Sequence, residues 1–345
     1  MASFHAALRG TGLGIPSKVL TNEDLAKFVD TNDEWIRTRT GIRERRLLDR
    51  EKGESLSLLG AQAAQEALDK AGIKAEELDA VICCTATPDT WMPISASRIL
   101  GHLRGRVAVD VFTADLNAAC SGYLAGLHVA NNFIRSGLHK KVLVVGGDIF
   151  SSIIDWTDRT TCILFGDGVG ASVLEAVEEA DASTAPVILG ARFGTLADFD
   201  HFLAVEGGGS AAPFTSAEFE SRKKRPVISM NGQEVFKLAC KHMAQKAHEV
   251  LADSGYTTRD VRWFVPHQAN LRIIEMVARM AEMPMDRVYV NVDRWGNTSA
   301  GTVAVALAEM QRGGMLKKGD LVLLDVFGGG FTYGAMLLRW GTDAT

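Results

Sequence analysis

The chain has 345 residues, of which 47% are hydrophobic and 23% charged, a balance typical of a globular enzyme with a large core. Its formal net charge of −5 gives no support to nucleic-acid binding, which depends on basic side chains that neutralise phosphates. We find no apolar stretch long enough to span a membrane and no signal-peptide pattern near Met1. These features exclude the nucleic-acid and membrane classes and predict a cytoplasmic protein.

The cysteines support the same location. Their number is odd, and none is arranged with the C-x-x-C spacing of a zinc or redox site. We therefore expect reduced thiols rather than disulfides, and no metal site. The five are Cys83, Cys84, Cys120, Cys162 and Cys240.

Short apolar runs that predict buried strands alternate with longer helical patterns. In chain order, the helical patterns cover residues 55–71, 120–136, 234–254 and 300–312. The expected strands cover residues 81–84, 107–112, 142–145, 171–174, 264–265 and 321–324. Such alternation is typical of an α/β fold whose largely parallel sheets are covered by helices on both faces.

The pattern is also repeated within the chain. Gly72 and Gly255 each end a helical pattern and precede a strand at the same distance. A G-x-x-x-G-A-x-x-L pattern begins at Gly166 and again at Gly330. We interpret the chain as two related α/β halves packed together, residues 1–180 and 181–345.

Residues 193–226 break this alternation. They contain three consecutive glycines at 207–209 and a basic run at 222–225. We expect a surface crossing between the halves. The basic run is either a solvated loop or a docking patch for an acidic carrier protein.

Cys120 is the first candidate for chemistry. It opens the helical pattern at 120–136, directly after two small residues. The start of a helix offers unpaired N–H groups and the positive end of the dipole, which favour the nucleophilic thiolate. On spacing alone, a buried structural cysteine explains the pattern at least as well.

His267 and Asn297 favour the catalytic interpretation. His267 follows the strand at 264–265, at the end where such sheets bind ligands. Asn297 begins the second-half helix that corresponds to the one opened by Cys120, although alone it would be read as a helix cap. Equivalent helix starts should meet where the halves join. The three residues would then suit acyl transfer onto sulfur, followed by chemistry that needs donors for a developing enolate oxygen.

At these residues the sequence resembles the β-ketoacyl-acyl-carrier-protein synthase III family, the initiating condensing enzymes of bacterial fatty-acid synthesis. The resemblance covers nearly the whole chain, and Asn297 points to the type III branch. It implies a homodimer with the thiolase-like α/β fold, in which two pseudo-symmetric halves form five layers (αβαβα). The motifs that carry it are residues 31–35, 39–45, 118–122, 165–168, 266–273, 296–300 and 327–331.

The resemblance implies a reaction in two stages. Cys120 first takes the acyl group from an acyl-CoA. Malonyl-acyl-carrier protein then loses CO₂ while His267 and Asn297 hydrogen-bond the enolate oxygen, and the carbanion attacks the acyl-cysteine. Backbone N–H groups of Cys120 and Gly329 would form the oxyanion hole. No cofactor or metal is implied, because coenzyme A enters as a substrate thioester and decarboxylation generates the carbanion.

The resemblance also implies where the substrates bind. Lys237 and Arg272 would recognise the carrier protein, and Met92 of the partner subunit would gate the acyl pocket. Met92 and Gln233 depart from the residues common in the family, Phe and Asn, which leaves the acyl chain open because a thioether is flexible. The implied coenzyme A contacts are Trp35, Arg39, Thr40, Arg159, Gln233, Phe236 and Asn270.

Two other functions stay open. A type III relative of secondary metabolism could pass the acyl group to an acceptor other than a carrier protein, although His267 and Asn297 favour condensation. A catalytically inactive scaffold is the third possibility, and the intact trio with Cys120 argues against it.

Overall fold

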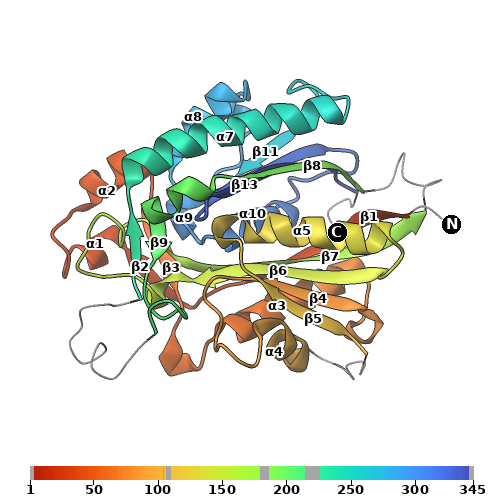
Figure 1. Cartoon of the computed structure of the whole chain (residues 1–345), viewed down its shortest axis with the longest axis horizontal. Helices are drawn as coiled ribbons and strands as arrows, with labels where there is room; N and C mark the ends of the chain where they lie inside the picture. Colours follow the sequence, from red (N-terminus) through yellow and green to blue (C-terminus); the bar gives the residue numbers. More distant parts are fainter. Residues whose placement is uncertain (1–3, 104, 106–109, 179–185, 214–225, 342–345) are drawn as a thin grey trace.

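The computed structural model describes residues 4–103, 105, 110–178, 186–213 and 226–341. Two sheets and three helical layers are stacked in the order αβαβα (Figure 1). The outer helices on one side are α3 (Leu56–Ala71) and α4 (Ser95–His102). Between the sheets lie α5 (Gly122–Arg135) and α10 (Gly301–Arg312). The opposite outer layer holds α7 (Gly232–Asp253) and α8 (Leu271–Met280), so the expected fold class is confirmed.

The first sheet has the strand order β1-β7-β6-β4-β5. Both neighbours of β4 run parallel to it, whereas β6 to β7 and β7 to β1 are antiparallel. Its strands are β1 (Phe4–Gly14), β4 (Ala80–Cys84), β5 (Phe112–Leu116), β6 (Lys141–Ile149) and β7 (Asp167–Glu178).

The second sheet repeats this arrangement in the order β11-β12-β13-β8. The pair β11 to β12 is parallel, and the next two pairs are antiparallel. A parallel bridge from Phe264 to Val288 takes the place that β5 has in the first sheet. The strands are β8 (Ile188–Thr195), β11 (Trp263–Pro266), β12 (Leu321–Gly328) and β13 (Thr332–Arg339).

The central helices are buried because their sequences are apolar on nearly every side. Residues from Gly301 to Ala308 of α10 are all buried. At Gly301 a side chain would place its Cβ 2.3 Å from the Gly168 carbonyl oxygen, so only glycine allows α10 to approach β7 this closely. This close packing brings the starts of α5 and α10, and with them Cys120 and Asn297, to the middle of the molecule.

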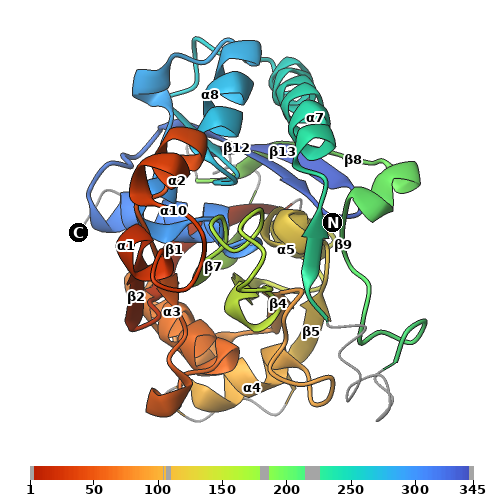
Figure 2. The ribbon, with the colours of Figure 1, turned by 90° about the vertical axis from the view of Figure 1, so that its left-hand side faces the viewer.

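The remaining elements extend this frame at one side. Figure 2 shows α2 (Asp33–Thr40) beside α8, close to α1 (Asn22–Leu25). In the sequence these two helices lie between β2 (Lys18–Thr21) and β3 (Glu44–Leu47), which pair with each other as antiparallel strands. Among the described residues, no helix is long and apolar enough to cross a membrane.

The structure differs from the sequence expectations in three places. The strand expected at 107–112 begins at Phe112, and residues 107–109 lie outside the described part. Cys120 occupies a 3-10 turn (Ala119–Ser121) that precedes α5 instead of opening it. The crossing at 193–226 contains β9 (Leu203–Val205), which pairs with β10 (Ile228–Met230) just beyond it, because the backbone N–H and C=O groups of two extended segments can bond to each other. The basic run at 222–225 and the division at 180/181 lie outside the described residues.

One buried carboxyl group stands apart from this apolar framework. Asp325 on β12 lies on the same face of the strand as Leu323 and Phe327, which belong to the core under α7 and α8. Its side chain is fully buried, and neither carboxyl oxygen has a hydrogen-bond partner. Burial raises the pKa of Asp325 well above its ordinary value.

We expect Asp325→Asn to stabilise the protein increasingly as the pH rises. The unfolded chain loses the Asp325 proton near the ordinary pKa, whereas the folded chain keeps it, so wild-type stability falls with pH in between. The advantage of the variant should grow by up to about 1.4 kcal/mol per pH unit. Denaturant unfolding at several pH values measures it, with the exposed Asp286→Asn as control. A pH-independent difference would contradict this assignment.

Candidate active site

A cavity of about 890 Å³ opens between the ends of the two sheets. Cys120, His267 and Asn297 all line it, together with Gly329. These residues come from four separate segments: the turn before α5, the end of β11, the segment before α10, and the turn after β12. The carboxyl ends of the parallel strands therefore bring the nucleophile candidate and both donor candidates to one place.

The Cys120 turn is held close to the glycine turn that follows β12. A side chain at Gly328 would place its Cβ 2.7 Å from the Cys120 nitrogen, so only glycine permits this contact. Ala119, directly before the cysteine, has a φ of 45°, in a region that costs a non-glycine residue free energy. The backbone N–H groups of Cys120 and Gly329 both lie within hydrogen-bonding reach of the sulfur.

The thiolate expected from the helix start is not favoured in this site. Burial raises the pKa of the Cys120 thiol to about 12. A hydrogen bond from Ser299 and the two backbone N–H groups lower the pKa in part, whereas the nearby Asp148 raises it. Desolvation thus outweighs the favourable dipole, and the sulfur carries its proton at neutral pH.

His267 is a neutral imidazole in this structure. It is buried at the end of β11, where its backbone N–H donates to the Asp325 carbonyl oxygen over 2.7 Å. Burial lowers the pKa of His267 to about 3. Its Nδ1 lies 2.8 Å from Thr302 Oγ1. The Thr302 hydroxyl has one proton, which it donates to the Ser299 carbonyl over 3.1 Å, so Nδ1–H donates to Thr302 Oγ1 and Nε2 is an acceptor in this arrangement. Nε2–H becomes a donor for a ligand in the cavity once the hydroxyl turns its proton to Nδ1.

Asn297 is fixed by contacts with the first half. Its backbone N–H donates to the Leu164 carbonyl over 2.8 Å, and its own carbonyl accepts from the Gly166 N–H over 3.0 Å. The side-chain Oδ1 accepts from the Ser299 N–H over 2.8 Å. Because Oδ1 is already used as an acceptor, the Nδ2 donors are the part of the amide suited to an oxygen ligand.

Ser299 and Thr302 connect the three residues, and the sequence reasoning missed both. The Ser299 hydroxyl lies 3.4 Å from Cys120 Sγ, and the Ser299 carbonyl lies 3.1 Å from Thr302 Oγ1. Ser299 also has a φ of 52°, so the backbone is strained at this junction. The available signal was the position of Ser299 in the same short motif as Asn297, and nothing in the sequence indicated Thr302.

A buried carboxylate supports the same junction from the first half. Asp148 ends β6, and its Oδ1 accepts from the hydroxyls of Thr85 and Thr87, each over 2.9 Å. Its Oδ2 accepts from the Ala300 N–H over 3.1 Å. Asp148 thereby ties the loop after β4 to the start of α10, next to the Cys120 turn. Sequence patterning did not distinguish it from other strand-end carboxylates.

We expect Ser299→Ala to slow alkylation of Cys120 by iodoacetamide at neutral pH about tenfold, since a hydrogen bond to a charged group contributes about 1.5 kcal/mol or more. The variant loses the hydroxyl that stabilises the thiolate but keeps the backbone N–H that holds Asn297. The measurement follows the modified peptide by mass spectrometry over time. Ser136→Ala, at the exposed end of α5, is the control, and an unchanged rate for Ser299→Ala would contradict the assignment.

The residues expected to bind coenzyme A form two groups. The guanidinium groups of Arg39 and Arg159 lie 4.4 and 5.3 Å from the Trp35 ring centroid. Arg159 also donates to the Asp30 carbonyl over 3.1 Å. An adenine can stack on a face of Trp35 that a guanidinium covers only after that guanidinium moves. Thr40 is buried, and its hydroxyl donates to the Ile36 carbonyl, so it serves the end of α2.

The second group lies along α7 and α8. Phe236 and Asn270 line the cavity, whereas Gln233 is exposed at the start of α7. The cations expected to recognise the carrier protein, Lys237 and Arg272, are both exposed. Lys237 forms an exposed ion pair with Glu234.

Met92 lies apart from these two groups. Its side chain is 85% exposed, and it is not among the residues that line the cavity, although the adjacent Trp91 is. Within a single chain, Met92 therefore does not close the cavity. This position is compatible with a gate that acts on a second subunit.

The chain matches two family models, 3-oxoacyl-[acyl-carrier-protein] synthase III at residues 114–192 and its C-terminal part at residues 251–340. It is 46% identical to a β-ketoacyl-[acyl-carrier-protein] synthase III of Roseiflexus sp. (strain RS-1), over 97% of this chain and 98% of the relative. A crystal structure of the synthase III from Aquifex aeolicus VF5 covers 97% of this chain and 100% of its own, with 40% identity and a TM-score of 0.87. A priming β-ketosynthase from a polyketide pathway covers 100% and 98%, with 31% identity and a TM-score of 0.89. The chain therefore belongs to the β-ketoacyl-[acyl-carrier-protein] synthase III family.

Proposed function

We propose that this protein transfers an acyl group from an acyl-CoA to Cys120 and then condenses it with malonyl-[acyl-carrier protein], with loss of CO₂. The observation that carries the proposal is the placement of Cys120, His267 and Asn297 on one cavity, connected through Ser299 and Thr302. A nucleophile and two neutral donors that are all buried in one site are what such a reaction needs.

The first stage uses the Cys120 turn. The sulfur attacks the thioester carbonyl, and the resulting oxyanion accepts hydrogen bonds from the N–H groups of Cys120 and Gly329. The bond to the coenzyme A sulfur then breaks, and coenzyme A leaves with the proton that Cys120 gave up. Because the pKa of the free thiol is about 12, this proton has to leave as the sulfur attacks.

The second stage uses the two donors. The malonyl thioester oxygen would lie between His267 Nε2–H and the Asn297 amide, and loss of CO₂ turns this oxygen into an enolate. The enolate carbon attacks the acyl-cysteine carbonyl, and the Cys120 sulfur leaves to give the β-ketoacyl product. A pKa of about 3 keeps His267 neutral, so it supplies a hydrogen bond without first having to lose a proton.

Substrate binding follows from the same placement. We assign the adenine to Trp35, with Arg39 and Arg159 around it, and the pantetheine arm to Phe236 and Asn270. Of the remaining implied contacts, Gln233 is exposed at the start of α7 and is free to reach the substrate from there, whereas Thr40 would act only by stabilising the end of α2. The exposed cations Lys237 and Arg272 suit an acidic carrier protein.

The assembly and its setting are part of the proposal. A homodimer is supported by the exposure of Trp91 and Met92, which are 77% and 85% exposed beside the cavity. We also propose a cytoplasmic location and a reaction without cofactor, in which coenzyme A takes part only as a thioester. Sedimentation of the purified chain measures the dimer, and a monomer would contradict it.

Turnover with defined substrates tests the function. The protein is incubated with straight and branched acyl-CoAs and malonyl-[acyl-carrier protein], and CO₂ and the carrier-bound product are measured by mass spectrometry. A β-ketoacyl product supports the proposal. Condensation or acyl transfer only with acceptors other than a carrier protein would favour the alternative role in secondary metabolism, to which the polyketide relative also relates.

We expect Met92→Phe to shorten the longest acyl-CoA accepted, because a rigid ring fills more of the partner's pocket than a flexible thioether. The readout is the rate of acyl-adduct formation on Cys120 across a chain-length series. Met285→Phe, at another exposed methionine, is the matched control. An unchanged chain-length profile would remove Met92 as the gate.

A further inference from the structure

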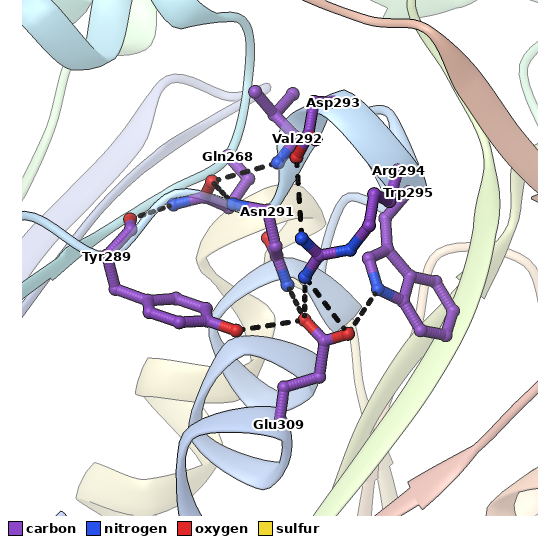
Figure 3. Close-up of polar contacts among 8 residues, drawn as sticks. All are labelled: Gln268, Tyr289, Asn291, Val292, Asp293, Arg294, Trp295 and Glu309. Carbon is purple, nitrogen blue, oxygen red and sulfur yellow. Dashed lines mark hydrogen bonds and ion pairs between the residues drawn. The ribbon is translucent and has the colours of Figure 1, made fainter. Parts of the chain in front are cut away.

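A carboxylate outside the cavity collects hydrogen bonds from a single short segment. Glu309 lies on α10, two turns beyond Thr302, and it does not line the cavity. Figure 3 shows its oxygens facing four side chains of residues 289–295. The donors are Tyr289 Oη at 3.1 Å, Asn291 Nδ2 at 2.6 Å, Arg294 Nη2 at 3.2 Å and Trp295 Nε1 at 2.9 Å.

This segment leads directly to Asn297. It forms the single-turn helix α9 (Val292–Trp295), which ends at Gly296, where φ is 63°. Two of the four donors belong to α9 itself, so Glu309 sets the position of the helix that delivers Asn297. The carboxylate side chain is only 20% exposed, and hydrogen bonds to such a shielded charge are stronger than those between neutral groups.

The same segment also holds the residue after His267. Gln268 Oε1 accepts from the backbone N–H groups of Asn291 and Val292, at 3.0 and 3.3 Å. Its Nε2 donates to the carbonyl oxygens of Tyr289 and Pro266, at 3.1 and 2.8 Å (Figure 3 draws the first). The side chain of Gln268 is buried, so these bonds define the path of the backbone next to His267.

We propose that Glu309 is a positioning residue that holds both enolate-binding donors, His267 and Asn297, through the segment 289–295. This inference rests on the proposed function and adds that separate sets of contacts position the residues of the two stages. The Cys120 turn is held by other contacts: the glycine turn after β12, Ser299 and the carbonyl of Thr332, which accepts from Ser121. Loss of the Glu309 carboxylate therefore disturbs the second stage of the reaction and leaves the first.

A comparison of the two stages tests this role. Glu309→Gln keeps the size of the side chain but removes the charge and turns one acceptor into a donor that faces other donors. Glu309→Ala removes all the contacts. We expect CO₂ release from malonyl-[acyl-carrier protein] to fall about tenfold in the Gln variant and further in the Ala variant. Acyl-adduct formation on Cys120 should stay within about twofold of wild type in both.

The controls separate positioning from general damage. Glu275→Gln removes an exposed carboxylate of α8, and it should leave both rates unchanged. Thermal unfolding of each variant is measured in parallel, and the Gln variant keeps the test decisive if the Ala variant fails to fold. Equal losses in both stages, or no loss in either, would overturn the positioning role. A wild-type protein that releases no CO₂ would instead overturn the proposed function itself.

Discussion

Cys120→Ser should abolish both the acyl adduct and condensation, with a loss of at least about a thousandfold. A serine hydroxyl is a far weaker nucleophile than a thiol. His267 is too weak a base to activate the hydroxyl, because burial lowers its pKa to about 3. Intact-protein mass spectrometry after incubation with an acyl-CoA measures the adduct, and peptide mapping locates it.

The structure offers a matched control for this experiment. Cys240 is buried in α7, and it does not line the cavity, so Cys240→Ser should keep full acylation. Together, the two variants distinguish loss of the nucleophile from loss of a buried thiol in general. An adduct formed at the wild-type rate by Cys120→Ser would show that another group is the nucleophile.

His267→Ala and Asn297→Ala should separate the two stages. Each removes one donor to the enolate oxygen, and loss of such a donor costs about a hundredfold to a thousandfold in rate. Neither residue is assigned to the oxyanion hole of the first stage, so acylation of Cys120 should continue close to the wild-type rate. Release of CO₂ from malonyl-[acyl-carrier protein] measures the loss, with the exposed His248→Ala as control.

The pH dependence adds a second readout. Burial lowers the pKa of His267 to about 3, so the imidazole does not change its charge in the physiological range. The wild-type decarboxylation rate should therefore show no inflection from this residue between about pH 5 and pH 8. Wild-type rates of CO₂ release by His267→Ala or Asn297→Ala would contradict the assigned roles. An inflection near neutral pH that disappears in His267→Ala would contradict the neutral donor.

The apolar runs along the chain predicted five of the strands but missed β1 and β13, which are also largely buried. The runs at 81–84, 142–145, 171–174, 264–265 and 321–324 lie within β4, β6, β7, β11 and β12. They could be recognised because a strand covered by helices on both faces has to be apolar on both sides. Cys120, His267 and Asn297 could be singled out as well, because the sequence placed each near the end of a strand or the start of a helix. His267 directly follows β11, whereas Cys120 and Asn297 precede α5 and α10 by a few residues instead of opening them.

The ionisation of the site could not be predicted this way. The position of Cys120 near the start of a helix predicted a thiolate, but burial raises the pKa of Cys120 to about 12. Desolvation depends on everything that packs around the sulfur, and α10, β12 and β6 bring those atoms from distant parts of the sequence. Likewise, Thr40 stands in one of the motifs that resemble the family, but its hydroxyl donates to the Ile36 carbonyl within α2.

Local pattern, then, was enough for five strands, the central helices and the three candidate residues, because hydrophobic period and chain position are properties of neighbouring residues. The contacts that orient those side chains appeared only on folding. Ser299 meets Cys120 across 179 residues of chain, and Glu309 holds a segment that begins 20 residues before it. The packing of α10 between the two sheets brings these pairs together. A hydrogen bond between residues far apart in the chain produces no periodic pattern in the sequence.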